Sequence, residues 1–179
     1  MKNFGHTLIF GGTGMLKETT KWLIDRTTQT RIYGRKSKSL EHSNTTYRLL
    51  DYTDTDKLIE EITLAHKDGG PIHTVLAWIH NTAPNAIPIM NKQIEQLQNE
   101  PWTLYLVKGS SSDIESIKSS QQNYQDQCKL KIIQLGLKYN GTSSRWLTHE
   151  EISAGTIDSM QSERDFTIIG TLKPWEARP

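Results

Sequence analysis

The chain has 179 residues and a formal net charge of +1, with a mean hydropathy of −0.60. This length is enough for one domain with a substantial hydrophobic core, and the near-zero charge argues against a nucleic acid or an anionic membrane as partner. No apolar run approaches the roughly 20 residues needed to span a bilayer. The first strand begins almost at the N-terminus, and Cys128 is the only cysteine. We therefore expect no signal peptide, no intramolecular disulfide and a cytoplasmic location.

The first motif of the chain lies between residues 7 and 23. A short apolar run changes there to the glycine cluster Gly11-Gly12-Thr13-Gly14, and apolar residues recur at helical spacing from Met15 onward. This order is typical of a buried strand, a tight turn and a helix. Glycine lets the backbone approach a ligand closely, and N–H groups at the start of a helix can bind a pyrophosphate. The motif predicts a dinucleotide site at residues 11–15, although many tight turns of this kind bind nothing.

On this interpretation Gly12 faces the pyrophosphate. Valine at this position is expected to abolish nucleotide binding in a protein that still folds, because a branched Cβ would take the space of the phosphate and restrict φ.

Strands and helices alternate along the rest of the chain. Apolar runs bounded by turn residues predict strands at 30–33, 47–50, 72–79, 102–107, 130–137 and 166–170. Helical spacing predicts a first helix that ends near residues 25–26 and later helices around 58–65, 83–97, 112–127 and 152–160. The alternation predicts an α/β fold with a doubly wound, mainly parallel, Rossmann-like sheet in three α/β/α layers. No linker or repeat divides the chain, so residues 1–179 are expected to form a single NAD(P)-binding domain.

The residues after the second predicted strand indicate which cofactor would bind. In folds of this kind that prefer NAD, a carboxylate about 20 residues past the glycine turn accepts a hydrogen bond from the ribose 2′-hydroxyl. Here that position is Gly34, and Arg35 and Lys36 follow it. A glycine that leaves room and cations that pair with a 2′-phosphate favour NADP(H) over NAD(H). The alternative is a solvated basic loop.

Two further strand ends should border the same cleft. Asp51 and Tyr52 follow the third strand; Asp51 could accept from the adenine amino group, or the acidic residues up to Asp54 could cap the next helix. Ile79 and His80 end the fourth strand. His80 can bind a ribose or carry a proton near neutral pH, and the alternative is a histidine satisfied by backbone groups.

The fifth strand ends in a serine cluster, at the place where a nicotinamide would lie. Ser112 and Glu115 have the spacing of a capping box, which gives Ser112 a structural role. Ser110 and Ser111 therefore remain as candidates to face the cleft.

The last helix has a clear predicted start. Thr148 and Glu151 form a second capping box. The polar segment before it, residues 139–146, is interpreted as a lid. Arg145 and Trp146 in this segment could touch substrate or cofactor, although a tryptophan in such a place is more often a packing anchor.

These motifs together resemble the short-chain dehydrogenase/reductase family. The matching parts are the glycine turn, Arg35, the segment Leu50-Asp51-Tyr52-Thr53-Asp54 and the serines after the fifth strand. Leu135-Gly136 stands where the family has a Pro-Gly pair, whereas Lys17 stands where many relatives have a third glycine. The resemblance implies a Rossmann fold, an NAD(P) cofactor, and catalysis by a serine with a Tyr-x-x-x-Lys pair on the following helix.

The catalytic part of the family pattern is incomplete. Tyr124 stands 13 residues after Ser111, near the family's usual separation, but Cys128 takes the place of the lysine. Lys129 comes one residue later, about 100° round a helix. The segment Ile79-His80-Asn81-Thr82 replaces the family's Asn-Asn-Ala-Gly.

Two functions of different classes follow. One is a small NADPH-dependent reductase of a carbonyl or imine, in which Ser110 or Ser111 orients the substrate oxygen and Tyr124 or His80 donates the proton. The other is a non-catalytic NADP(H)-binding sensor or regulatory module, which the missing lysine favours. A third interpretation is a Rossmann-like domain that binds no nucleotide. The sequence predicts no metal site, identifies no partner beyond a small-molecule substrate, and leaves a homo-oligomer open.

Overall fold

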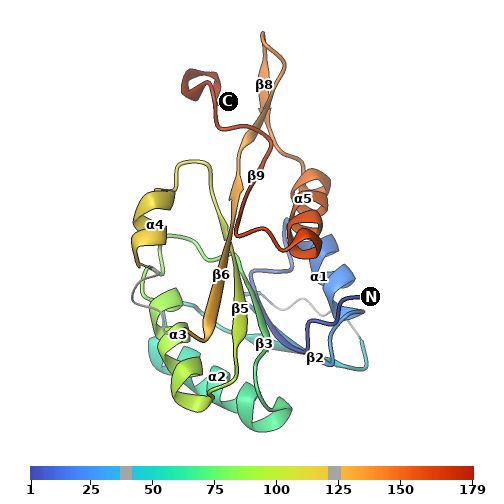
Figure 1. The fold of residues 1–179 in the computed structure, drawn as a ribbon, viewed down its shortest axis with the longest axis vertical. Helices are drawn as coiled ribbons and strands as arrows, with labels where there is room; N and C mark the ends of the chain where they lie inside the picture. The colour runs from blue at the N-terminus through green and yellow to red at the C-terminus, as the bar shows by residue number, and fades with distance from the viewer. Residues whose placement is uncertain (37–41, 121–125) are drawn as a thin grey trace.

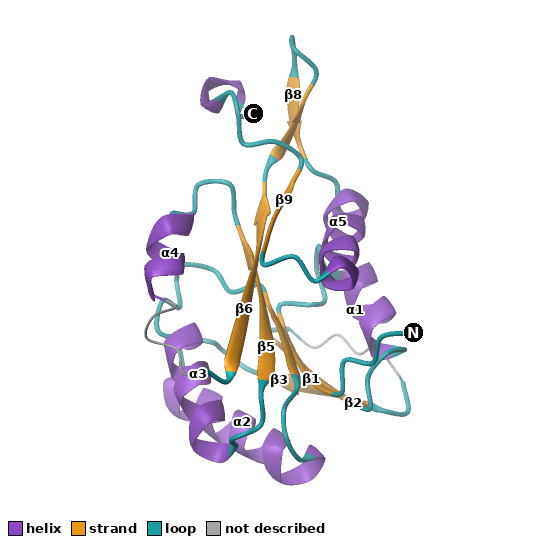
Figure 2. Ribbon diagram, in the orientation of Figure 1, coloured by secondary structure: helices purple, strands orange, loops and turns teal. Residues whose placement is uncertain are grey.

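In the computed structural model of the protein, which describes residues 1–36, 42–120 and 126–179, the apolar runs form the strands of a seven-stranded parallel sheet (Figures 1 and 2). Its strands are β1 (His6–Phe10), β2 (Gln29–Gly34), β3 (Thr45–Leu49), β4 (Thr74–Ala77), β5 (Trp102–Lys108), β6 (Cys128–Leu135) and β9 (Phe166–Ile169). Their order across the sheet is β3-β2-β1-β4-β5-β6-β9, with every neighbouring pair parallel. This order confirms the predicted doubly wound, Rossmann-like fold.

Helices cover both faces of the sheet (Figure 1). They are α1 (Lys17–Ile24), α2 (Thr55–Gly69), α3 (Ala86–Leu97), α4 (Ile114–Ser120) and α5 (His149–Ser162). Successive strand residues point to opposite faces: Leu104 and Leu106 of β5 pack in the core under α2 and α3, whereas Tyr105 and Val107 pack in the core under α1 and α5. The helices therefore form the outer layers of the predicted α/β/α arrangement. Among the described residues, no helix combines the length and the apolar character needed to cross a membrane.

Several elements begin or end at other residues than predicted. β4 covers Thr74–Ala77 rather than 72–79, and α3 begins at Ala86 rather than 83, because the residues between them form a loop of turns. β6 ends at Leu135 rather than 137, and Leu137 begins the next strand. Gly136 between them approaches the backbone of Thr171 too closely for any side chain.

The helix predicted over residues 112–127 begins two residues later than expected, at Ile114. α4 covers Ile114–Ser120, and residues 126 and 127 form a turn before β6. Asp113 caps it: its carboxylate accepts a hydrogen bond from the N–H of Ser116 at 3.1 Å. The prediction that Ser112 caps this helix is therefore wrong, because the cap is the next residue, Asp113. Tyr124 lies outside the described residues.

The segment interpreted as a lid is a β-hairpin that extends beyond the sheet (Figure 2). Its strands β7 (Leu137–Tyr139) and β8 (Ser144–Trp146) pair antiparallel. The Asn140 side chain closes the turn by accepting from the N–H groups of Thr142 at 3.0 Å and Ser143 at 2.8 Å. Local hydrogen bonds therefore give this segment a regular structure in place of an irregular loop.

The residues after the hairpin confirm the second capping box. Thr148 accepts from the N–H of Glu151, whose side chain bonds back to the N–H of Thr148. Arg145 also binds the Glu151 carboxylate, at 2.9 and 3.0 Å. The guanidinium, together with the Thr148 N–H, lowers the pKa of Glu151 to about 2. Arg145 thus pairs with α5, and Trp146, at 49% exposure, is not a packing anchor.

Gly12 faces the core. A Cβ at this position would collide with the side chains of Ile9 and Thr20. The Thr20 hydroxyl also donates to the Gly12 carbonyl at 2.7 Å, which fixes α1 against the end of β1. The expectation that a Gly12 side chain would enter the phosphate space of a normally folded protein is therefore wrong.

Gly12→Val should instead destabilise the fold. Overpacking a filled core typically costs about 1–3 kcal/mol, so the midpoint of urea unfolding should fall. Gly14→Val is the matched control, since a Cβ on Gly14 meets no atom within 4 Å. Equal unfolding midpoints for the two variants would contradict this account of Gly12.

Candidate functional site

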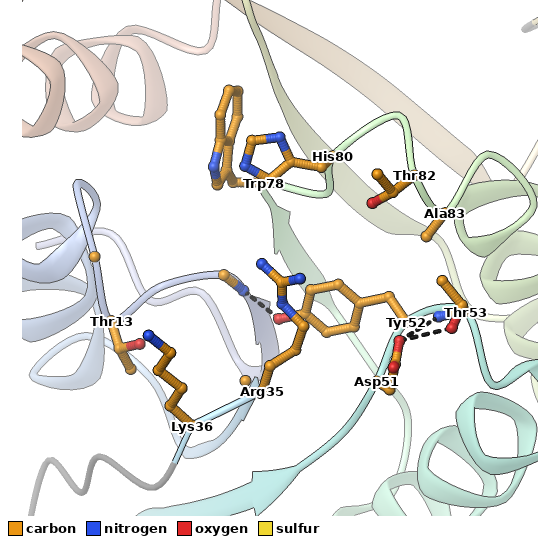
Figure 3. A pocket seen from close by; sticks show the side chains of 13 residues that line it. Thr13, Arg35, Lys36, Asp51, Tyr52, Thr53, Trp78, His80, Thr82 and Ala83 are labelled. Atoms are coloured by element: carbon orange, nitrogen blue, oxygen red, sulfur yellow. Dashed lines mark hydrogen bonds between the residues drawn. The ribbon is translucent and has the colours of Figure 1, made fainter.

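A cavity of about 400 Å³ lies at the carboxyl ends of the central strands (Figure 3). The strand order reverses between β1 and β4, and open α/β sheets bind ligands in the crevice at such a switch point. The loops after β1, β2, β3 and β4 supply its lining: Gly11, Thr13, Gly14, Gly34, Arg35, Lys36, Asp51, Tyr52, Thr53, Trp78, His80, Thr82 and Ala83.

The glycine turn leads into α1, which begins at Lys17, and Leu16 at its N-cap position provides no side-chain acceptor. The N–H of Lys17 donates to the Gly14 carbonyl at 3.0 Å, and the N–H of Thr19 donates to the Ser153 hydroxyl of α5 at 3.3 Å. The N–H groups of the turn itself lie ahead of this helix start, where an anion can bind. Gly14 is exposed and borders the cavity with open space around its Cα. The turn therefore offers backbone N–H donors next to a space at Gly14 that no side chain fills.

Tyr52 holds two strand ends together. Its hydroxyl accepts from the N–H of Gly11 at 2.8 Å and donates to the carbonyl of Tyr33 at 2.7 Å. Phe10 stacks on Tyr33 with ring centroids 4.7 Å apart and meets the Tyr52 ring edge-on at 5.9 Å. Burial raises the pKa of Tyr52 to about 12. The ring lines the cavity, but its polar atom already serves the backbone.

Arg35 and Lys36 form the basic side of the cavity. Both are exposed, and Figure 3 shows Arg35 extending across the Tyr52 ring and Lys36 extending toward Thr13. Gly34 does not leave the expected room, because the Tyr47 hydroxyl lies where its Cβ would be. That hydroxyl donates to the Lys36 carbonyl and so positions the basic loop.

The acidic residues after β3 divide their roles. Asp54 caps α2 by accepting from the N–H of Lys57 at 3.0 Å. Asp51 lines the cavity and accepts from the N–H and hydroxyl of Thr53 at 2.9 and 2.8 Å. These two bonds, with a smaller contribution from Arg35, lower the pKa of Asp51. Asp51 therefore presents a carboxylate to the cavity, and Asp54 has the structural role.

His80 is exposed and borders the cavity. Its ring meets Trp78 edge-on, with centroids 5.2 Å apart. Among the described residues its side chain has no backbone hydrogen-bond partner, so the alternative of a backbone-satisfied histidine does not hold for this part of the chain. Ile79 between them is buried, at 5% exposure, and packs in the core under α2 and α3.

A second hollow, of about 220 Å³, lies at the ends of β5 and β6 and is mainly apolar. Its lining consists of Gly109, Ser110, Leu135, Gly136, Trp146, Leu147 and Ile152. Ser111 is exposed and is not part of this lining. Of the two serine candidates, the structure brings only Ser110 to a hollow.

Two residues far apart in sequence hold the serine loop in place. The Gln134 amide donates to the carbonyls of Gly109, Ser110 and Ser112 at 3.2–3.4 Å. The Arg178 guanidinium donates to the Ser110 carbonyl at 3.1 Å. Sequence reasoning missed both, although an amide among the apolar residues of β6 was a signal for Gln134.

The predicted cofactor residues are thus largely brought together. Those that line the cavity are Gly11, Thr13, Gly14, Arg35, Lys36, Asp51, Tyr52 and His80. Gly12, Met15 and Ile79 are not in its lining; the Met15 carbonyl accepts from Ser153 of α5 at 3.1 Å. Trp78 and Thr82 line the cavity as well, from the segment 78–82 that the sequence predicts to border the cleft. The sequence prediction missed Thr53 and Ala83, whose loop positions no periodic pattern indicates.

Solved structures with this architecture are numerous. Comparisons with protein-family models and with curated proteins gave no match. A short-chain dehydrogenase/reductase from Brucella melitensis, described as glucose/ribitol dehydrogenase, superposes with a TM-score of 0.69 over 94% of this chain and 96% of its own, at 10% identity. The chain has the fold of the short-chain dehydrogenases/reductases.

Two further structures with the short-chain dehydrogenase/reductase fold support this conclusion. An enzyme from Burkholderia cenocepacia J2315, in complex with NADP, gives a TM-score of 0.70 over 96% of this chain and 90% of its own, at 9% identity. A short-chain dehydrogenase from Novosphingobium aromaticivorans gives 0.64 over 99% and 85%, at 14% identity. At such identities the likeness shows the fold alone.

Tyr52→Phe should lower the free energy of unfolding by about 1 kcal/mol, because it removes two short hydrogen bonds and leaves the Gly11 N–H and the Tyr33 carbonyl with only their mutual bond of 3.3 Å. Urea unfolding measures the effect. Tyr139→Phe is the control, since its hydroxyl bonds the Gly141 carbonyl on the exposed hairpin and its loss should cost no more than about 0.5 kcal/mol. Equal losses in the two variants would refute a bridging role for Tyr52.

Proposed function

We propose that this protein binds NADP(H) in the cavity at the ends of β1–β4 and uses it to reduce a carbonyl or imine compound. The observation that carries the proposal is the convergence of the glycine turn before α1 and two exposed cations in one cavity at the switch point of the sheet. Helix N-termini bind phosphates through N–H groups and dipole, and arginine binds them through parallel hydrogen bonds.

The lining residues fit the parts of a dinucleotide. The turn at Gly14 and the start of α1 would hold the pyrophosphate, because no side chain intrudes there. Arg35 and Lys36 would pair with a 2′-phosphate, and the Asp51 carboxylate would accept from the adenine amino group. When bound, the nicotinamide supplies a hydride. We propose that its ring would be directed to the apolar hollow at β5 and β6.

The proposed catalytic residues border these two spaces: His80 lines the cavity, and Ser110 lines the hollow. Ser110 would orient the substrate oxygen through its hydroxyl, which the bonds from Gln134 and Arg178 to its loop keep in place. His80 would donate the proton, since histidine can exchange one near neutral pH. Ser111 and Tyr124 stay predictions: Ser111 lies outside the hollow, and Tyr124 lies outside the described residues.

A second candidate is an NADP(H)-binding sensor or regulatory module without turnover. Cys128, in the position where the family resemblance places a lysine, favours it. Burial raises the pKa of the Cys128 thiol to about 12, so it is neutral and cannot take over the role of a cation.

Arg35→Ala should weaken NADPH binding by about ten- to a hundred-fold, the usual cost of a charge-assisted contact, and leave NADH binding nearly unchanged. Fluorescence titration of wild type and variant with each cofactor measures this. Arg164→Ala controls for net charge, because Arg164 is an exposed arginine just after α5 that pairs with Asp158 of that helix. Identical NADPH and NADH curves in the wild type would contradict the assignment of the 2′-phosphate.

His80→Gln should lower kcat for NADPH-dependent reduction by about 10²-fold or more, the usual contribution of general acid catalysis. The assay follows NADPH oxidation across a panel of carbonyl and imine compounds, with Ser110→Ala and Tyr124→Phe in parallel. Turnover indifferent to both His80→Gln and Tyr124→Phe would remove both proposed acids. Tight NADPH binding without turnover on any compound would establish the sensor instead.

A further inference from the structure

Lys108 occupies a position that the strand pattern assigns to the core. Trp102, Leu104 and Leu106 alternate along β5 and pack in the core under α2 and α3. Lys108 is the next residue of this row and ends the strand. Because residues two apart in a strand share a face, its side chain leaves the sheet toward α3 and α4, where packing alone would favour another apolar residue.

A small cavity of about 160 Å³ receives this side chain. Ile79, Leu106 and Ile117 are among its apolar walls, and His80 and Lys108 are the titratable groups among its described lining residues. His80 also lines the proposed nucleotide cavity, so the two cavities adjoin at the loop after β4. At a liquid volume of roughly 30 Å³ per water, this space holds about five waters, which suits a carboxylate with a short carbon chain.

The Lys108 ammonium is not neutralised within the described part of the chain. No carboxylate lines its cavity there, and no described residue forms a hydrogen bond or an ion pair with the ammonium. Burial lowers the pKa of Lys108, which shows the cost of removing the charge from water. A half-buried cation without a partner is less favourable than a paired one, and an anion that enters the cavity reduces that cost.

We propose that Lys108, with His80 beside it, forms a subsite for a carboxylate, and that the substrate of this protein is a small carboxylic acid that bears the reducible carbonyl or imine. The proposal rests on the proposed function for the reaction, whereas the anion subsite itself depends only on the cavity. Lysine binds an anion as a point charge from a flexible stem, and the apolar walls can pack against the carbon chain of the acid. Lys108 would therefore determine specificity without taking part in proton transfer.

The test compares butyrate with butyramide, two probes of nearly equal size that differ in charge. Each is titrated into the ¹⁵N-labelled full chain, with and without saturating NADPH, and binding is followed by NMR. The variants are Lys108→Met, which removes the charge, and Lys108→Arg, which keeps it. Lys92→Met, on the exposed side of α3, makes the same change in net charge away from the cavity.

Wild type, Lys108→Arg and Lys92→Met should bind butyrate about tenfold or more tightly than butyramide, and Lys108→Met should lose this preference. Equal binding of the two probes to the wild type, or an unchanged preference in Lys108→Met, would overturn the subsite. Displacement of butyrate by NADPH, with weaker NADPH binding in Lys108→Met, would overturn it too, because the anion would then be a nucleotide phosphate. A Lys108-dependent preference for butyrate in a protein that binds no NADPH would support the subsite and refute the proposed function separately.

Discussion

The site depends on a hydrogen-bonded contact between the ends of two neighbouring strands, in which the Gly11 N–H donates to the Tyr33 carbonyl at 3.3 Å and the Tyr52 hydroxyl bonds to both groups. Tyr52, from the loop after β3, satisfies the Gly11 N–H at the end of β1 and the Tyr33 carbonyl near the end of β2. Gly11 can turn away at this point because its φ of 74° is readily available only to glycine. The glycine turn and the basic loop therefore start from fixed positions, and both reach the same cavity.

The sheet could be predicted from the sequence because buried parallel strands are nearly continuous apolar runs. Prediction from the sequence failed where the same residue type is common in two different structural roles. Gly12 lies in a glycine cluster typical of nucleotide sites, yet the contact with Ile9 and Thr20 explains it. Similarly, Ser112 and Asp113 are both good N-cap residues, and only the course of the backbone decides in favour of Asp113.

The site residues that sequence reasoning missed depend on contacts between distant segments. Arg178 reaches the Ser110 carbonyl from the C-terminal tail, and no local pattern predicts this contact. Lys108 did carry a signal, because it continues an alternating row of buried residues along β5. A charged residue at such a position is costly for folding, so a role with a ligand was the interpretation to consider. The fold was thus more predictable than the chemistry. Many residues together determine a strand, so the pattern survives one exception, whereas the role of a single site residue depends on its own contacts.

The central claim, that this cavity is an NADP(H) site, is tested most directly by a crystal structure of the protein with NADPH. The account predicts the pyrophosphate at Gly14 and the start of α1, the 2′-phosphate beside Arg35 and Lys36, and the nicotinamide directed toward Ser110. Nucleotide bound away from the ends of β1 and β2, or a 2′-phosphate that faces solvent without contact to Arg35 or Lys36, would contradict it.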